Sequence, residues 1–136
     1  MRYLLDTDTC IHALRGTTSV VRSIAAQPPT DISISSITTY ELLTGVEKCA
    51  DPLRERNRLD LLFSVLSQVT FDLAAAQAAA RIRAALEERG EMMGPYDVLI
   101  AGQALSLGLT LVTGNVNEFS RVTGLAIEDW QTAVPP

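Results

Sequence analysis

The sequence predicts an α/β fold with a parallel central sheet, because short β-compatible runs alternate with longer helical patterns along all 136 residues. Hydrophobic residues make up 47% of the chain, which is enough for one compact domain with its own core. No linker, internal repeat or low-complexity segment divides the sequence. We therefore expect residues 1–136 to form a single domain.

Four runs have the character of strands, because they are rich in apolar or β-branched side chains and end at polar or turn-forming residues. They cover residues 2–5, 31–36, 69–71 and 109–113. The segments between them show helical periodicity. These helices are expected over residues 8–14, 18–26, 37–49, 53–66, 72–89 and 96–107. The clearest is 72–89, which is rich in alanine and stops at Gly90.

Cysteine usage and hydropathy indicate the compartment. Cys10 and Cys49 lack the spacing of a metal site, and the first residues lack the long apolar stretch of a signal peptide. The most apolar stretch, 98–112, contains Gln103 and Ser106 and is shorter than the roughly 20 residues that a membrane-spanning helix needs. We expect a cytoplasmic protein with reduced thiols and no membrane span.

The charge gives an ambiguous signal about partners. The net charge is −5, which argues against a nucleic-acid-binding protein because phosphate contacts usually need a basic surface. However, Lys48 is the only lysine among the 11 basic residues, and the others are arginines, which bind phosphate through two hydrogen bonds at once. Composition alone leaves the partner open.

Acidic side chains fall where a parallel sheet gathers its ligands. The strands of such a sheet point their carboxyl ends to one edge, and the connecting helices begin at that edge. Asp6 and Asp8 directly follow the first expected strand. Glu41 lies in the first turns of one expected helix, and Asp97 opens another. We therefore expect these carboxylates to lie close together.

The segment after the last expected strand adds further oxygen-bearing side chains to the same edge, among them Asn115 and Glu118. Clustered carboxylates repel one another and raise one another's pKa, so a stable cluster needs a cation. Ligands that are all oxygen favour Mg²⁺ or Mn²⁺. Such an ion activates a bound water and stabilises charge on a phosphoryl oxygen without help from His or Cys.

Each acid also has a simpler interpretation as a helix cap. Thr38 and Glu41 fit a capping box, Asp97 is a favourable anion in a first helical turn, and Asp8 could cap a helix. Capping explains each residue singly, but it does not require Asp6, Glu41 and Asp97 to share one edge. Their conjunction favours a metal site.

Four segments together resemble the VapC branch of the PIN-domain ribonucleases, which are the toxins of bacterial toxin–antitoxin pairs. They are LLDTDTCI (4–11), ISSITTYELLTGVEK (34–48), GPYDVLIAGQA (94–104) and LVTGNVNEFSRVTGLAIEDW (111–130). The match spans nearly the whole chain. It implies a three-layer α/β/α PIN-like domain whose mainly parallel sheet has about four or five strands.

The resemblance also implies roles for individual residues. Asp6, Glu41 and Asp97 correspond to the acidic triad that holds the metal, Mg²⁺ or Mn²⁺. Asn115 and Glu118 correspond to a fourth corner of the catalytic site, as direct, water-mediated or outer-shell groups. Asp8, another possible outer-shell group, stands where relatives often have Asn, and Gly114 stands where they often have a polar or basic residue.

The function implied is that of a metal-dependent endoribonuclease toxin that cleaves structured RNA. The leading substrate is tRNA, with the anticodon stem-loop of initiator tRNA as the favoured target. The implied partners are a VapB-type antitoxin that neutralises the toxin and forms a hetero-oligomer with it, and a second copy in a homodimer. Tyr96 could stack on an RNA base, although an aromatic beside Pro95 is more often packed.

Two other classes fit part of the pattern. A phosphatase of haloacid-dehalogenase type would use Asp6 of the Asp6-Thr7-Asp8 run as a phosphorylated nucleophile. A non-catalytic receiver-like module would accept phosphate on an aspartate in an acidic Mg²⁺ pocket. Both need a lysine at the end of a later strand, whereas Lys48 lies on the helix after the second strand. Labelling by acetyl phosphate would separate both classes from a nuclease.

Overall fold

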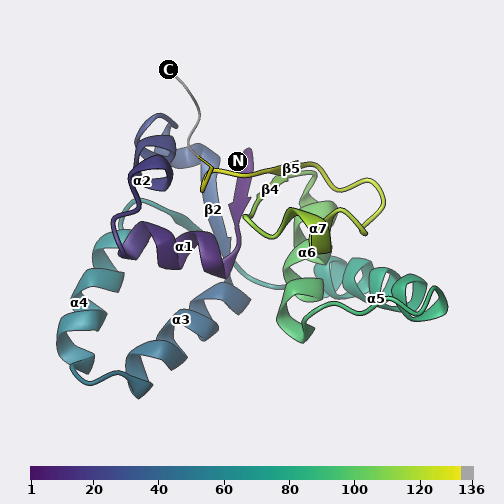
Figure 1. Cartoon of the computed structure of the whole chain (residues 1–136), viewed down its shortest axis with the longest axis horizontal. Helices are drawn as coiled ribbons and strands as arrows, with labels where there is room; N and C mark the ends of the chain where they lie inside the picture. The colour runs from purple at the N-terminus through teal and green to yellow at the C-terminus, as the bar shows by residue number, and fades with distance from the viewer. Residues whose placement is uncertain (133–136) are drawn as a thin grey trace.

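The computed structural model describes residues 1–132, which form a central sheet with helices on both faces (Figure 1). The elements follow in the order β1 (Tyr3–Leu5), α1 (Thr7–Leu14), α2 (Thr18–Ala25), a 3-10 turn (Pro29–Asp31), β2 (Ile32–Ser35), α3 (Ser36–Lys48), α4 (Pro52–Phe63), β3 (Ser67–Val69), α5 (Leu73–Glu88), α6 (Pro95–Leu107), β4 (Thr110–Val112), α7 (Val116–Phe119) and β5 (Ile127–Glu128). The strand order is β3-β2-β1-β4-β5, and all neighbouring strands are parallel. The predicted fold class is confirmed.

Alternation along the short strands divides the core into two layers, because successive side chains of a strand point to opposite faces of the sheet. Tyr3 and Leu5 pack with Val112 and with residues of α1 to α4. Leu4 and Leu111 pack with residues of α5 and α6. Figure 1 shows the same division, with α1 to α4 on one side of the sheet and α5 and α6 on the other.

The sequence predicted the helices α1 to α6 and the first four strands, and it missed α7 and β5. The expected strand at 69–71 lies two residues earlier, at Ser67–Val69, and the helix expected to reach residue 66 ends at Phe63. The helix α7 has four residues and β5 has two, so neither is long enough to show a periodicity. The strand β5 forms through pairing with β4, where the Thr113 amide donates to the Glu128 carbonyl at 2.9 Å.

The two helices behind the sheet, α5 and α6, approach each other through a glycine. A Cβ atom added at Gly102 of α6 would lie 2.5 Å from the backbone nitrogen of Ala79 and 2.6 Å from its Cα atom. Both atoms belong to the backbone of α5, which cannot move without moving the helix. Only glycine therefore allows this packing.

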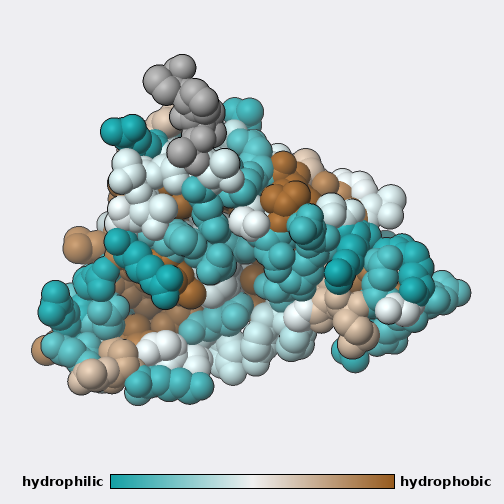
Figure 2. Space-filling model, in the orientation of Figure 1, coloured by the Kyte–Doolittle hydropathy of each residue, from teal (hydrophilic) through white to brown (hydrophobic). Residues whose placement is uncertain are grey.

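The opposite side of the molecule carries a groove of about 310 Å³ between α1, α3 and α4, lined among others by Ile11, Leu14, Leu42, Val46 and Leu59. Figure 2 shows apolar surface in this hollow with hydrophilic residues around it. Within residues 1–132, no helix combines the length and apolar character needed to cross a bilayer.

Candidate active site

Asp6 lies between the end of β1 and the start of α1, which places its carboxylate at the carboxyl edge of the sheet. It caps α1 by accepting a hydrogen bond from the Thr9 amide at 2.8 Å. Only 3% of the residue is exposed, and this burial raises the pKa of Asp6 despite hydrogen bonds from Thr113 and Thr9. Asp6 is therefore both a helix cap and a buried carboxylate that gains from a neighbouring cation.

Asp97 lies in the first turn of α6, half-buried beside other acids. Burial is the main cause that raises its pKa to about 7, and the charges of Glu118, Asp6 and Glu41 raise it further. The turn before the helix is tight, since a Cβ at Gly94 would lie 3.1 Å from the Asp97 Oδ2 atom. The predicted convergence of acids from β1, α3 and α6 is thus present.

Glu41 reaches this edge from the second turn of α3. Its Oε1 atom accepts a hydrogen bond from the Thr7 hydroxyl at 2.7 Å, and Thr38 lies 3.2 Å from the same hydroxyl. The Thr7 hydroxyl thus orients this carboxylate. Glu41 therefore has a fixed direction set by a residue next to Asp6.

The segment of Asn115 and Glu118 links α7 to the start of α6. The Gly94 amide donates to the Glu118 Oε1 atom at 2.9 Å, and the Asn115 side-chain amide donates to the other carboxylate oxygen. The Asn115 backbone amide donates in turn to the Thr113 hydroxyl at 2.9 Å. These bonds hold Glu118 near Asp97. The segment expected to form the fourth corner therefore lies beside the acids.

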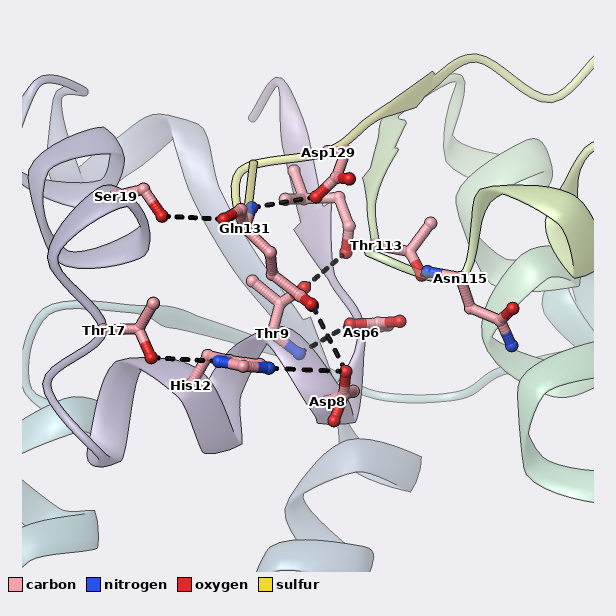
Figure 3. Close-up of polar contacts among 11 residues, drawn as sticks. Asp6, Asp8, Thr9, His12, Thr17, Ser19, Thr113, Asn115, Asp129 and Gln131 are labelled. Carbon is pink, nitrogen blue, oxygen red and sulfur yellow. Dashed lines mark hydrogen bonds and ion pairs between the residues drawn. The ribbon is translucent and has the colours of Figure 1, made fainter. Parts of the chain in front are cut away.

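The acids open into a cavity of about 300 Å³, lined by Asp6, Asp8, Asp97, Gly114, Asn115, Phe119 and Gln131. Figure 3 shows Gln131 reaching toward Asp8 from the segment after β5. Its amide donates to the Asp8 Oδ2 atom at 3.2 Å, while the Ser19 hydroxyl donates to its backbone carbonyl at 3.0 Å. Asp8 lines this cavity and is exposed to solvent, so it lies where the cavity opens.

Gln131 also lies over the glycine at position 114. A Cβ atom there would lie 2.3 Å from the Gln131 Oε1 atom, so any side chain at Gly114 displaces this glutamine. The two departures from the family pattern, Asp8 and Gly114, thus face the same side chain. Sequence reasoning missed Gln131, since it lies beyond the recognisable motifs and only the fold brings it to this cavity.

The acids are near one another but are not arranged as a finished metal shell. Among the residues that the structure describes, no three His, Cys, Asp or Glu side chains are already placed to hold one ion. Glu41 is turned to Thr7 and Glu118 to Gly94, which keeps these like charges apart. The prediction that Asp6, Glu41 and Asp97 share a cation stays a prediction.

Two aromatic side chains stand beside the acids. Tyr96 of α6 is 40% exposed. It contacts Tyr40 of α3, which is 54% exposed, with ring centroids 5.7 Å apart. Tyr96 is therefore packed against another aromatic ring, but the pair lies at the surface rather than in the core.

The lysine required by the two phosphate-accepting alternatives lies in the wrong place. Lys48 is the last residue of α3, whose first turns face the acids. Lys48 lies 12 residues after Ser36, which corresponds to about 18 Å along the helix at the rise of about 1.5 Å per residue. A phosphatase or receiver-like site has no strand-end lysine here.

Comparisons with known proteins give one consistent result. The PIN domain family matches residues 3–125. The tRNA(fMet)-specific endonuclease VapC of Salmonella typhimurium is 39% identical over 130 residues, which cover 96% of this chain and 98% of that protein. Ribonuclease VapC2 of Rickettsia felis is 33% identical over 132 residues, with the same two coverages.

Solved structures agree with the sequence comparisons. The DNA-bound VapBC from Salmonella typhimurium matches with a TM-score of 0.91 at 38% identity, covering 96% of this chain and 98% of that chain. VapBC2 from Rickettsia felis, bound to a DNA fragment from its promoter, matches with a TM-score of 0.90 at 32% identity, covering 96% and 99%. The similarity therefore includes every segment that contributes an acid to the cavity.

Proposed function

The chain belongs to the VapC branch of the PIN-domain family, and from this membership we propose that it is a Mg²⁺- or Mn²⁺-dependent endoribonuclease toxin that cleaves tRNA in the cytoplasm. The observation that carries the proposal is the proximity of carboxylates from separate segments at the carboxyl edge of a parallel sheet: the charges of Asp6, Glu41 and Glu118 all act on Asp97, and Asp6, Asp8 and Asp97 line one cavity. Helix capping does not account for this cluster, because of Asp6, Glu41 and Asp97 only Asp6 is the N-cap residue of a helix.

The donor atoms fit a hard divalent cation. Asp6, Asp97 and Glu41 offer carboxylate oxygens, with the amide oxygen of Asn115 nearby, and neither Cys10 nor His12 is needed. Glu41 would exchange its bond with Thr7 for the ion. Burial and the neighbouring acids raise the pKa of Asp97, and a bound cation would counter both effects by stabilising the ionised carboxylate.

When bound, a divalent cation activates a water for in-line attack on an RNA phosphodiester and counters the charge that develops on the phosphate. The chain's own residues provide the positions. Asp6 is fixed by the Thr9 amide, and Thr7 is placed to release or reorient Glu41. Glu118, held by the Gly94 amide, aligns the start of α6 and thereby Asp97. Asp8 and Gln131 form the polar rim on the other side.

The substrate proposal follows the curated relatives. The Salmonella typhimurium protein is named as specific for tRNA(fMet), and we propose initiator tRNA, cut in its anticodon stem-loop, for this chain also. The net charge of −5 is consistent with this proposal if the cation neutralises part of the acidic cluster before RNA binds. RNA affinity should then depend on the metal.

The solved relatives are VapBC complexes, and we propose a VapB-type antitoxin as the partner of this chain. The apolar groove between α1, α3 and α4 offers an anchor for a segment of such a partner, and the acidic cavity suits a basic side chain. A homodimer of the chain stays part of the same proposal.

Cleavage of initiator tRNA tests the function. We expect the purified chain to cut initiator tRNA in Mg²⁺ or Mn²⁺, to lose about a hundredfold or more of its rate in EDTA, and to recover when the metal returns. Elongator methionine tRNA is the matched substrate control. Cleavage that continues in EDTA would disprove the metal requirement, and equal cleavage of both tRNAs would disprove the substrate.

A further inference from the structure

Tyr40 and Tyr96 form an aromatic pair that the catalytic proposal does not use. Their rings meet edge to face, with centroids 5.7 Å apart and planes at 62°, and the two hydroxyl oxygens lie 3.5 Å apart. This geometry is a favourable one for two aromatic rings, and it leaves ring faces open to solvent. The pair is thus a defined exposed surface, assembled from residues 56 positions apart.

The position of the pair is tied to the acids by the covalent chain. Tyr40 directly precedes Glu41 on α3, and Tyr96 directly precedes Asp97 on α6. A group held by this pair would therefore lie next to the acidic cavity.

The core does not account for the exposure of these rings. Of the remaining aromatic side chains in residues 1–132, Tyr3, Phe119 and Trp130 are buried, and Phe63 and Phe71 are partly buried. The two exposed aromatics are thus the two that meet beside the acids. An exposed apolar surface that folding does not require is a candidate for binding.

We propose that Tyr40 and Tyr96 form a stacking platform for an unpaired base of the RNA next to the cleaved phosphate. The proposal rests on the ribonuclease function and specifies how the substrate is held. Every base has a flat π face, so an aromatic platform binds single-stranded RNA without reading its sequence. Tyrosine is also neutral, whereas an arginine in this place would pair with the acids and compete with the cation.

The platform predicts a loss of substrate binding when the rings are removed. We expect Tyr40→Ala and Tyr96→Ala each to raise KM for RNA cleavage by about tenfold or more, with a smaller change in kcat, because stacking on one aromatic contributes about that factor to affinity. Tyr40→Phe and Tyr96→Phe keep the rings and should stay within about twofold of the parent. Leu53→Ala, which removes a 74% exposed side chain from α4, is the matched control.

A binding measurement separates this proposal from the function on which it rests. A short RNA with 2-aminopurine in an unpaired position reports stacking through fluorescence quenching, with or without cleavage. Quenching by the parent that persists in the alanine variants, or equal KM values, overturns the platform even if the chain cleaves RNA. Phenylalanine variants as weak as the alanine variants would overturn stacking in favour of the hydroxyls. Changed association in sedimentation with unchanged KM would make the pair a contact between copies and would also overturn it.

Discussion

Replacing Asp97 with asparagine is expected to abolish RNA cleavage and, in the absence of a divalent cation, to make the protein more stable above pH 7. The carboxylate is one of three that we propose as cation ligands, and its loss should lower kcat by about a hundredfold or more, because charge stabilisation by a single group contributes about 3 kcal/mol to a transition state. Activity and stability should therefore move in opposite directions.

The pH dependence follows from the raised pKa of Asp97. Its ordinary value is 3.8, and in the folded protein burial and neighbouring acids raise it to about 7. The folded state thus holds a proton that the unfolded chain loses, so stability is full below about pH 4 and falls as the pH rises through about 7. Asparagine does not ionise, so Asp97→Asn avoids this loss. Above pH 7 its free energy of unfolding should exceed that of the parent by about 1–2 kcal/mol, once solvent screening of a half-exposed group is included.

Urea unfolding in EDTA, at about pH 5 and about pH 8, measures this effect. The gain of Asp97→Asn over the parent should be larger at the higher pH. Asp60→Asn is the matched control, since Asp60 forms only an exposed ion pair with Arg56 at 2.9 Å. An Asp97→Asn protein that cleaves RNA at the parent rate, or that loses stability above pH 7, would contradict the assignment.

Replacing Gly102 with alanine should destabilise the fold more than other substitutions of similar size. The added Cβ would lie 2.5 Å from the Ala79 backbone nitrogen, and no side-chain rotation can relieve that overlap. Separating α5 from α6 loosens the layer behind the sheet and should lower the free energy of unfolding by about 3 kcal/mol.

Gly45 provides the matched control for this substitution. It lies inside α3, and a Cβ added there would have nothing within 4 Å. Gly45→Ala should therefore stabilise the protein by about 0.5–1 kcal/mol, because alanine has the higher helix propensity. If urea unfolding shows the same change for both variants, the close packing of α5 and α6 is wrong.

The fold was predictable to the extent that its elements are long enough to carry a pattern. The helix α5 has 16 residues, begins after the cap Asp72 and ends before Gly90, and each of these signals is local. By contrast, β5 depends on pairing with β4, and that contact exists only once the chain has folded. The same reason explains why the third strand was placed two residues too late.

The site was predictable where topology alone decides it. Asp6 and Asp97 follow a strand and open a helix, so a parallel sheet brings them to one edge whatever the details of packing. Side-chain direction is different, because it depends on contacts distant in sequence. The bond from Thr7 to Glu41, the reach of Gln131 to Asp8 and the pairing of Tyr40 with Tyr96 could not be read from neighbouring residues.

Binding of Mn²⁺ to the parent and to Asp97→Asn tests most directly whether the clustered acids share a cation. We expect calorimetry near pH 7 to find saturable binding to the parent, accompanied by proton release because the ion displaces the proton of a carboxyl whose pKa is about 7. Asp97→Asn should bind Mn²⁺ more weakly by about tenfold or more and should release no proton on binding. Asp60→Asn should match the parent. Equal affinity in the parent and Asp97→Asn, or no binding to the parent, would contradict the account.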